Sequence, residues 1–227
     1  MTANRASVSF RGVTADGWGI VLFGDVVHSR REAAETADWL RAVCGDLDAR
    51  YGDARLAAFG FTQGDELQGL LRLDADPFLA VLAAGLRDDR RRIRWSIAAG
   101  EVARGRGPAT ERSGPAFIAA RERLAEAKAA RDGLSVVTGD PAADALFDDL
   151  APLLTTLIDE LTSRQRTMAR LLIVDGLRQA EVAERLRVSR ATVSVVAGRG
   201  RVREIGRLAR ALHRILDAAG GDGLVRG

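Results

Sequence analysis

The hydrophobic pattern of the first 75 residues predicts strands and a helix in alternation. Residues 19–23 (GIVLF) form an unbroken apolar run, which is typical of a central strand buried on both faces. Residues 30–50 then show the three-and-four spacing of a helix. Two further strands are expected at 56–61 and 66–71, and the four turn-forming residues between them predict a hairpin.

The alternation continues to residue 138. Pro77 opens a predicted helix that runs to about Leu86, because proline is favoured in the first helical turn. Residues 93–99 (IRWSIAA) predict a fourth strand, a long helix is expected over 114–128, and residues 134–138 (LSVVT) predict a fifth strand. The first six elements follow the order βαββαβ, which is that of the ferredoxin-like fold.

From residue 161 onward the apolar spacing is helical and is interrupted only at short turns. Helices are expected within 161–176, 178–188, 189–201 and 202–216. The predicted fold class is therefore α+β. We expect a ferredoxin-like, palm-type sheet domain at 1–140, a helical linker at 141–160, an all-α helix-turn-helix domain at 161–217 and a flexible tail at 218–227.

Composition and charge narrow the function classes. Apolar residues make up 47% and charged residues 29%, which describes a globular protein, and no apolar run approaches the roughly 18 residues of a membrane span. The first residues lack the pattern of a secretory signal, so a cytoplasmic location is expected. Residues 156–227 hold 14 arginines against 8 acids, whereas residues 1–155 hold 20 basic residues against 23 acids. The basic carboxy-terminal part indicates a polyanionic partner.

Two acidic residues are predicted to meet at one edge of the sheet. A right-handed β-α-β crossover makes the first two strands parallel, so Asp25 and Asp65 lie at the same edge. Mg2+ prefers oxygen ligands and needs only one or two carboxylates, so this pair could hold it. The alternative is ordinary turn chemistry, because Asp and Gly are common in turns. Candidate residues for a phosphate ligand at the same edge are Gly24, Ser29, Gly64, Arg90, Arg91 and Arg92.

Four segments resemble, in the same order, the motifs of the nucleotidyl-cyclase and GGDEF palm superfamily: IVLFGDVVHSR, FTQGDELQGLL, IRWSIAAGEVARG and GPAFIAARERL. The resemblance implies that Asp25 and Asp65 hold metal, with Glu66 as an auxiliary acid. The chain also resembles the SatD family, and this likeness covers most of its length. A nucleotide ligand with Mg2+ is the cofactor expectation that follows.

One departure from the cyclase pattern bears on catalysis. Class III cyclases carry Asn and Arg four residues apart on the helix after strand four, where they stabilise the transferring phosphate. Arg121 matches the arginine, but Phe117 stands in place of the asparagine and offers no hydrogen bond to a developing charge. Arg121 is therefore a doubtful catalytic residue, and a surface ion pair with Glu122 or Glu126 is the alternative.

The carboxy-terminal segment carries the features of a helix-turn-helix. Ala183 is the small residue at the closest helix approach, apolar residues flank it, and Ser189 is a cap for a recognition helix. The opening Leu161-Thr162-Ser163-Arg164-Gln165 also resembles sigma-factor region-four and LuxR-type modules. A helical bundle used only for protein contacts is the alternative. Candidate DNA-binding residues are Gln179, Ser189, Arg190, Thr192, Ser194, Arg199, Arg201 and Arg203.

The leading hypothesis is a transcriptional regulator that binds DNA as a homodimer and senses a nucleotide or other phosphate ligand. Two alternatives remain open: a metal-dependent nucleotidyl cyclase or transferase, and a degenerate palm domain that serves only as a dimerisation scaffold. Because Phe117 replaces the expected asparagine, catalysis is not the favoured expectation.

Overall fold

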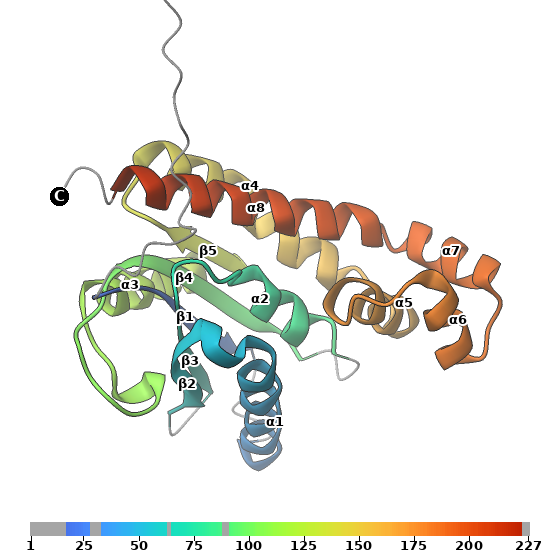
Figure 1. Ribbon diagram of the computed structural model, residues 1–227, viewed down its shortest axis with the longest axis horizontal. Coiled ribbons are helices and arrows are strands. Elements are labelled where there is room, and N and C mark those ends of the chain that lie inside the picture. Colours follow the sequence, from blue (N-terminus) through green and yellow to red (C-terminus); the bar gives the residue numbers. More distant parts are fainter. Residues whose placement is uncertain (1–16, 28–32, 63–64, 88–90, 224–227) are drawn as a thin grey trace, which may run out of the picture.

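Five strands form a mixed sheet in the computed structural model, which describes residues 17–27, 33–62, 65–87 and 91–223 (Figure 1). Their order across the sheet is β2-β3-β1-β4-β5, and only the β4–β5 pair is parallel. Strands β1 and β2 therefore run in the same direction, which confirms the predicted βαββαβ arrangement. The strands are β1 (Trp18–Val26), β2 (Arg55–Phe61), β3 (Glu66–Leu71), β4 (Ile93–Glu101) and β5 (Leu134–Val137).

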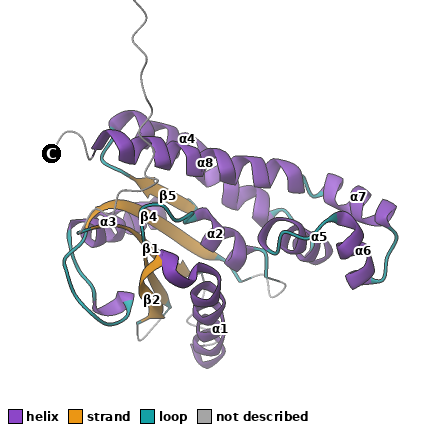
Figure 2. Ribbon diagram, in the orientation of Figure 1, coloured by secondary structure: helices purple, strands orange, loops and turns teal. Residues whose placement is uncertain are grey.

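Helices lie on both faces of this sheet and extend beyond it at one end (Figure 2). A π-helical turn over Arg170–Val174 prolongs α5. No helix in the described part of the chain is long and apolar enough to cross a lipid bilayer. The helices are α1 (Ala33–Tyr51), α2 (Phe78–Gly85), α3 (Pro115–Ala130), α4 (Pro141–Asp159), α5 (Ser163–Ala169), α6 (Gln179–Leu186), α7 (Arg190–Arg199) and α8 (Val202–Gly223).

Strand β1 is buried on both faces, which explains its unbroken apolar run. Ile20 and Leu22 belong to the large core shared with α1, α2, α4 and α8. Val21 and Phe23 belong to a second core beneath α3. Since side chains alternate along a strand, Asp25 falls on the same face as Phe23, at the end of the strand. The sheet therefore places Asp25 next to the carboxy-terminal part of α3.

Helix α4 occupies the segment expected to be a linker, and it packs on the sheet. Asp140 caps α4 by accepting hydrogen bonds from the N–H groups of Ala142 and Ala143 at 2.8 and 3.0 Å. Phe147 and Leu154 of α4 are fully buried in the large core. The amphipathic apolar face of this helix requires such a partner, so α4 is a structural layer of the sheet domain.

Helix α8 returns along α4, and the two lie side by side (Figure 1). Ile205, Leu212 and Leu216 are fully buried in the same core that fills the space between the sheet and α4. One hydrophobic core thus crosses from the sheet domain into the carboxy-terminal helices. The segment 218–223, expected to be loose, continues α8, because Leu216 and Ala219 keep its last turns against the core.

Cys44 packs on the inner face of α1, in the large core. Burial and the nearby Asp48 carboxylate raise the pKa of its thiol to about 12. The thiol therefore stays protonated near neutral pH, and it serves as a small apolar core residue.

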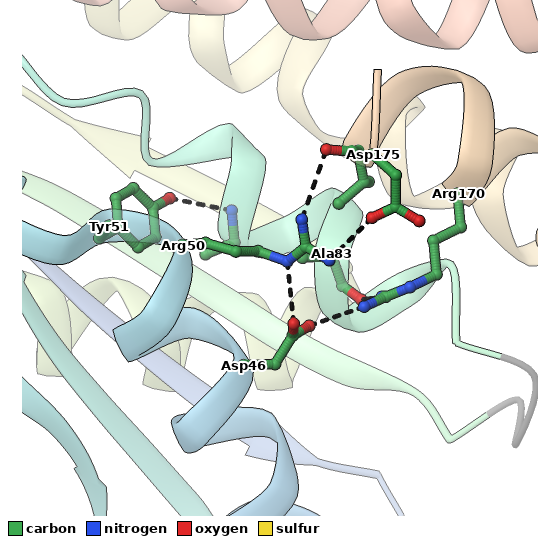
Figure 3. A network of polar contacts seen from close by, with 8 residues as sticks. Asp46, Arg50, Tyr51, Ala83, Arg170 and Asp175 are labelled. Atoms are coloured by element: carbon green, nitrogen blue, oxygen red, sulfur yellow. Dashed lines mark hydrogen bonds and ion pairs between the residues drawn. The ribbon is translucent and has the colours of Figure 1, made fainter. Parts of the chain in front are cut away.

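Arg50 of α1 and Arg170 of the π turn after α5 fasten the carboxy-terminal helices to the sheet domain (Figure 3). Arg170 donates to the Ala83 carbonyl oxygen at 2.5 Å and to Asp46 Oδ2 at 2.7 Å. Arg50 donates to Asp46 Oδ1 at 3.0 Å and to Asp175 Oδ1 at 2.9 Å. Asp46 on α1 is therefore held between two guanidinium groups, one from α1 itself and one from the π turn that follows α5.

This arrangement predicts a pH-dependent contribution of Asp46 to stability. Burial opposes ionisation of Asp46, but hydrogen bonds and charges of Arg170 and Arg50 outweigh it and hold the pKa below its usual range. A carboxyl with a lowered pKa contributes stability above pH 4, and that contribution is lost as pH falls through the folded-state pKa. We expect Asp46→Asn to lower the free energy of unfolding at pH 7 by about 1–2 kcal/mol.

Urea unfolding of Asp46→Asn at pH 7 and near pH 3 checks this prediction, with Asp38→Asn on the exposed side of α1 as the control. The deficit of Asp46→Asn should shrink at the lower pH, whereas Asp38→Asn should match the parent protein at pH 7. An equal deficit for both variants would contradict the proposed role of the Asp46 ion pairs.

Candidate functional sites

The edge predicted to hold two acids is a mixed charge cluster. Asp25 faces Glu66 of β3 on one side and Arg94 of β4 on the other, as direct cross-strand partners. The Asp25 side chain is 13% exposed; its Oδ1 lies 2.7 Å from Lys128 Nζ, and its Oδ2 lies 3.6 Å from Arg94 Nη1. A buried carboxylate needs such compensation, and two cations supply it here.

Arg121 extends the cluster along α3. Its guanidinium lies 5.3 Å from the centre of the Phe23 ring and 3.8 Å from Glu66 Oε1. The expected alternative, a pair with Glu122 or Glu126, is not what the structure records, because Arg121 turns toward the sheet. Phe117 is buried and packs edge-on against Phe23, with ring centroids 6.1 Å apart. An apolar pair therefore occupies the position at which the resemblance to cyclases led us to expect asparagine.

The predicted metal ligands come together only in part. The Asp65 carbonyl oxygen accepts a hydrogen bond from the Val26 N–H at 3.1 Å, so the hairpin and the end of β1 do meet. Among the described residues, however, no group of three His, Cys, Asp or Glu side chains is positioned to hold a metal ion. The residues that fit an oxygen-seeking cation are the cross-strand pair Asp25 and Glu66, which could supply two carboxylates to Mg2+.

The predicted phosphate-contacting residues have varied surroundings. A Cβ added to Gly24 would lie 2.9 Å from Ile93 Cγ2 and 3.1 Å from the Trp95 ring, so packing alone requires this glycine. Arg91 donates to Thr36 Oγ1 at 3.1 Å, and Arg92 lies 2.5 Å from Asp159. Three further candidates lie outside the described residues: Ser29, Gly64 and Arg90.

Arg94 and Lys128 are site residues that the sequence pattern did not reveal. Arg94 could have been found from its register, because it lies in strand four directly opposite Asp25. Lys128 carried a different signal, since it is the single lysine among 34 basic residues. Its approach to Asp25 depends on how α3 crosses the sheet, which no local spacing determines.

The carboxy-terminal helices contain a small core of their own. Val182 and Ala183 of α6 pack with Val193 of α7, and Met168 and Leu171 of the preceding helix complete the cluster. Arg187 joins α6 to α7 in the left-handed conformation, with φ 52° and ψ 46°. An arginine accepts this conformation at a cost of roughly 1–2 kcal/mol, which explains why glycine is frequent at such turns.

Helix α7 begins with the predicted cap. The Ser189 hydroxyl accepts a hydrogen bond from the Thr192 N–H at 3.0 Å and contacts Thr192 Oγ1 at 2.9 Å. These two hydroxyls are thus engaged with each other. Arg190, Ser194 and Val195 are exposed on the same helix, and 53% of Val195 is accessible.

The segment that contains α7 is basic, although two glutamates from its surroundings pair with its arginines. Between residues 185 and 203 the chain has no Asp or Glu, and all six of its arginines are exposed. Arg201 lies 3.8 Å from Glu160 Oε2, and Arg203 pairs with Glu204 at 3.2 Å. Gln179 and Ser194 line a hollow of about 540 Å3 between α6, α7 and α8, together with Arg203 and Arg210. The six arginines are Arg185, Arg187, Arg190, Arg199, Arg201 and Arg203.

Comparison with known proteins gives little more. No protein-family profile matches the chain, and no curated protein matches it. Two solved structures of a bacterial light-regulated adenylyl cyclase align with 54% of this chain at 15% sequence identity and a TM-score of 0.36. The aligned region spans 44% of the cyclase chain, which is less than half of its length.

Proposed function

We propose that this protein is a transcriptional regulator that binds DNA through α6 and α7. The observation that carries the proposal is the segment 185–203, which has six exposed arginines and no Asp or Glu. Phosphate neutralisation supplies most of the affinity of DNA-binding proteins, and a segment without acids limits repulsion from the phosphates.

The exposed side chains of α7 suit contact with base edges. Arg190 lies in its first turn, where a recognition helix enters the major groove, and arginine binds the O6 and N7 atoms of guanine. Ser194 and Val195 lie one turn later, and Val195 offers an apolar surface to a thymine methyl group. Arg199, Arg201 and Arg203 follow as phosphate contacts, and binding as a homodimer to two half-sites remains our prediction.

A mobility-shift titration tests the DNA-binding half. Duplexes enriched from a random pool by the parent protein should be retarded by it and not by Arg190→Ala at the same concentration. Arg41→Ala, an exposed arginine on α1, is the matched control and should bind as the parent does. If the pool yields no enriched duplex, or if Arg190→Ala retards it equally, the proposal fails.

We further propose that the sheet edge binds a nucleotide with Mg2+. The cross-strand carboxylates of Asp25 and Glu66 would hold the cation, and Lys128 and Arg121 lie close enough to contact phosphate oxygens. The bound cation would supply charge neutralisation for the phosphates. For this to happen, Lys128 must release Asp25, which its long and partly exposed side chain allows.

Calorimetric titration of ATP, GTP and cyclic nucleotides, with and without Mg2+, tests the sensor half. We expect Mg2+-dependent binding that Asp25→Asn weakens at least about tenfold, since a charged contact is removed. Asp148→Asn, on the outer side of α4, should leave the affinity unchanged. If none of these nucleotides binds in the presence of Mg2+, the sheet edge is not a nucleotide sensor.

Sensing fits the site better than catalysis does. The packed pair Phe23 and Phe117 offers no hydrogen-bond donor to a transferring phosphate, which leaves a nucleotidyl transferase without that stabilisation. Incubation with labelled nucleoside triphosphates distinguishes a sensor from a nucleotidyl transferase, because only the transferase would convert the label to product. An Asp25→Asn variant that folds, dimerises and binds DNA as the parent protein does, with no nucleotide bound by either protein, would instead favour the dimerisation scaffold.

A further inference from the structure

A pocket of about 500 Å3 lies beside the charge cluster, between the start of β4, the end of α3 and the inner side of α4. Its volume is within the range of about 300–1,000 Å3 usual for small-molecule sites. None of the residues predicted to contact DNA lines it, and Asp25 lies just outside it. The pocket is therefore separate from the α7 surface and adjoins the Asp25 cluster from the α4 side.

The lining is strongly cationic. Six basic side chains line the pocket, namely Arg91, Arg92, Arg94, Lys128, Arg131 and Arg166, against two acidic ones, Asp132 and Asp159. Asp25 and Glu35, just outside, pair with Lys128 and Arg91. Even with these two carboxylates counted, two positive charges remain in excess among the described residues.

One of these cations, Arg94, has its side chain held in place, and the backbone of another, Arg131, is fixed at the end of α3. Arg94 is 17% exposed, and its Nε donates to the Asp132 carbonyl oxygen at 3.0 Å while Nη1 faces Asp25. Arg131 ends α3 in the left-handed conformation (φ 65°, ψ 23°), which sets its backbone at the pocket rim. Fixed guanidinium groups lose little entropy on binding a phosphate, and their planar geometry suits two of its oxygens.

Apart from Thr155, the rest of the lining is apolar or glycine and includes Val81, Ile93 and Ile158. A wall of this kind favours a ligand with an apolar body beside a charged end. We propose that this pocket binds a small organic phosphate carrying at least two phosphate charges, and that it does so without a metal ion. The excess of positive charge replaces the cation that the Asp25 site would need.

The shared cations give the proposal a distinctive consequence. Lys128 and Arg94 contact Asp25 on one side and the pocket on the other, so Asp25 competes with a bound phosphate for them. Removing the Asp25 charge should therefore strengthen phosphate binding in the pocket. The same change weakens the proposed Mg2+-nucleotide site, and the opposite signs keep the two proposals experimentally distinct.

Calorimetric titration of the full chain with pyrophosphate in EDTA tests the pocket, with citrate as a polyanion without phosphorus. We expect pyrophosphate to bind and citrate to bind at least about tenfold more weakly. Lys128→Gln and Arg131→Asn should each weaken pyrophosphate binding about tenfold, since each removes one charged contact. Asn tolerates the left-handed backbone at 131, so this variant removes charge without strain.

Two further variants complete the test. Asp25→Asn should strengthen pyrophosphate binding severalfold in EDTA, and Arg123→Gln should leave it unchanged, because Arg123 on α3 pairs with Asp148 away from the pocket. Pyrophosphate at millimolar concentration should also raise the melting temperature of the parent protein. The proposal is overturned if pyrophosphate neither binds nor stabilises the parent, if citrate binds equally well, or if folded Lys128→Gln and Arg131→Asn bind as the parent does.

Discussion

Replacing Arg166 by leucine is expected to lower the free energy of unfolding by about 3–5 kcal/mol. The Arg166 side chain is only 4% exposed and donates to the carbonyl oxygens of Gly85 and Leu161, with Asp159 Oδ1 at 3.8 Å. Leucine would leave these oxygens buried with fewer donors, and unsatisfied buried acceptors are costly. The contact with Gly85 also closes the carboxy-terminal end of α2, so its loss loosens the seam between α2 and α5.

Urea unfolding followed by tryptophan fluorescence and circular dichroism measures this effect. Arg164→Leu, an exposed position on the same helix, is the control and should change stability by no more than about 0.5 kcal/mol. Because one core spans the sheet and α8, both probes should report a single transition for the parent protein. A loss below about 1 kcal/mol for Arg166→Leu would show that the buried arginine does not hold the seam.

The second large effect concerns DNA binding. Arg190→Ala should weaken binding to a selected duplex by about 1–3 kcal/mol and relax the preference at one base position. Arg199→Ala should weaken binding to all sequences more evenly and reduce the slope of log affinity against log salt by about one. The difference follows from position, since Arg190 begins α7 and Arg199 ends it.

Fluorescence anisotropy at several salt concentrations, on a selected and a scrambled duplex, separates these two behaviours. Arg41→Ala again serves as a control of equal charge change and should keep both the slope and the preference. Should Arg190→Ala and Arg199→Ala lose affinity equally on both duplexes, with equal changes of slope, α7 would contact phosphates only and would not read bases.

Much of the sheet domain could be predicted from the spacing of apolar residues and from the Gly, Pro and turn residues between the elements. The unbroken run at 19–23, the hairpin signal and the Gly114-Pro115 start each gave an element close to its observed bounds. Asp25 was expected near Asp65 because a β-α-β crossover makes β1 and β2 parallel. The packing of α4 against the sheet could not be predicted from the sequence. Its apolar face shows that the helix is buried on one side but not which part of the protein covers that side.

Site residues that lie opposite each other on neighbouring strands could be predicted from the sequence. Contacts that depend on how helices pack on the sheet could not. Register alone puts Glu66 and Arg94 beside Asp25. The pairing of Asp25 with Lys128, and the pocket under α4, require the crossing of α3 and the return of α4 onto β5. Arg187, between α6 and α7, adopts the left-handed conformation that a glycine would have provided, and its residue type gave no sign of it.

Mapping the DNA bound by the parent protein and by Arg190→Ala across the genome of the host tests whether α7 reads DNA sequence. We expect discrete sites for the parent that share a short sequence, and loss of most of these sites for Arg190→Ala at equal protein level. Indistinguishable profiles for the two proteins, or an absence of enriched sites for the parent, would contradict it.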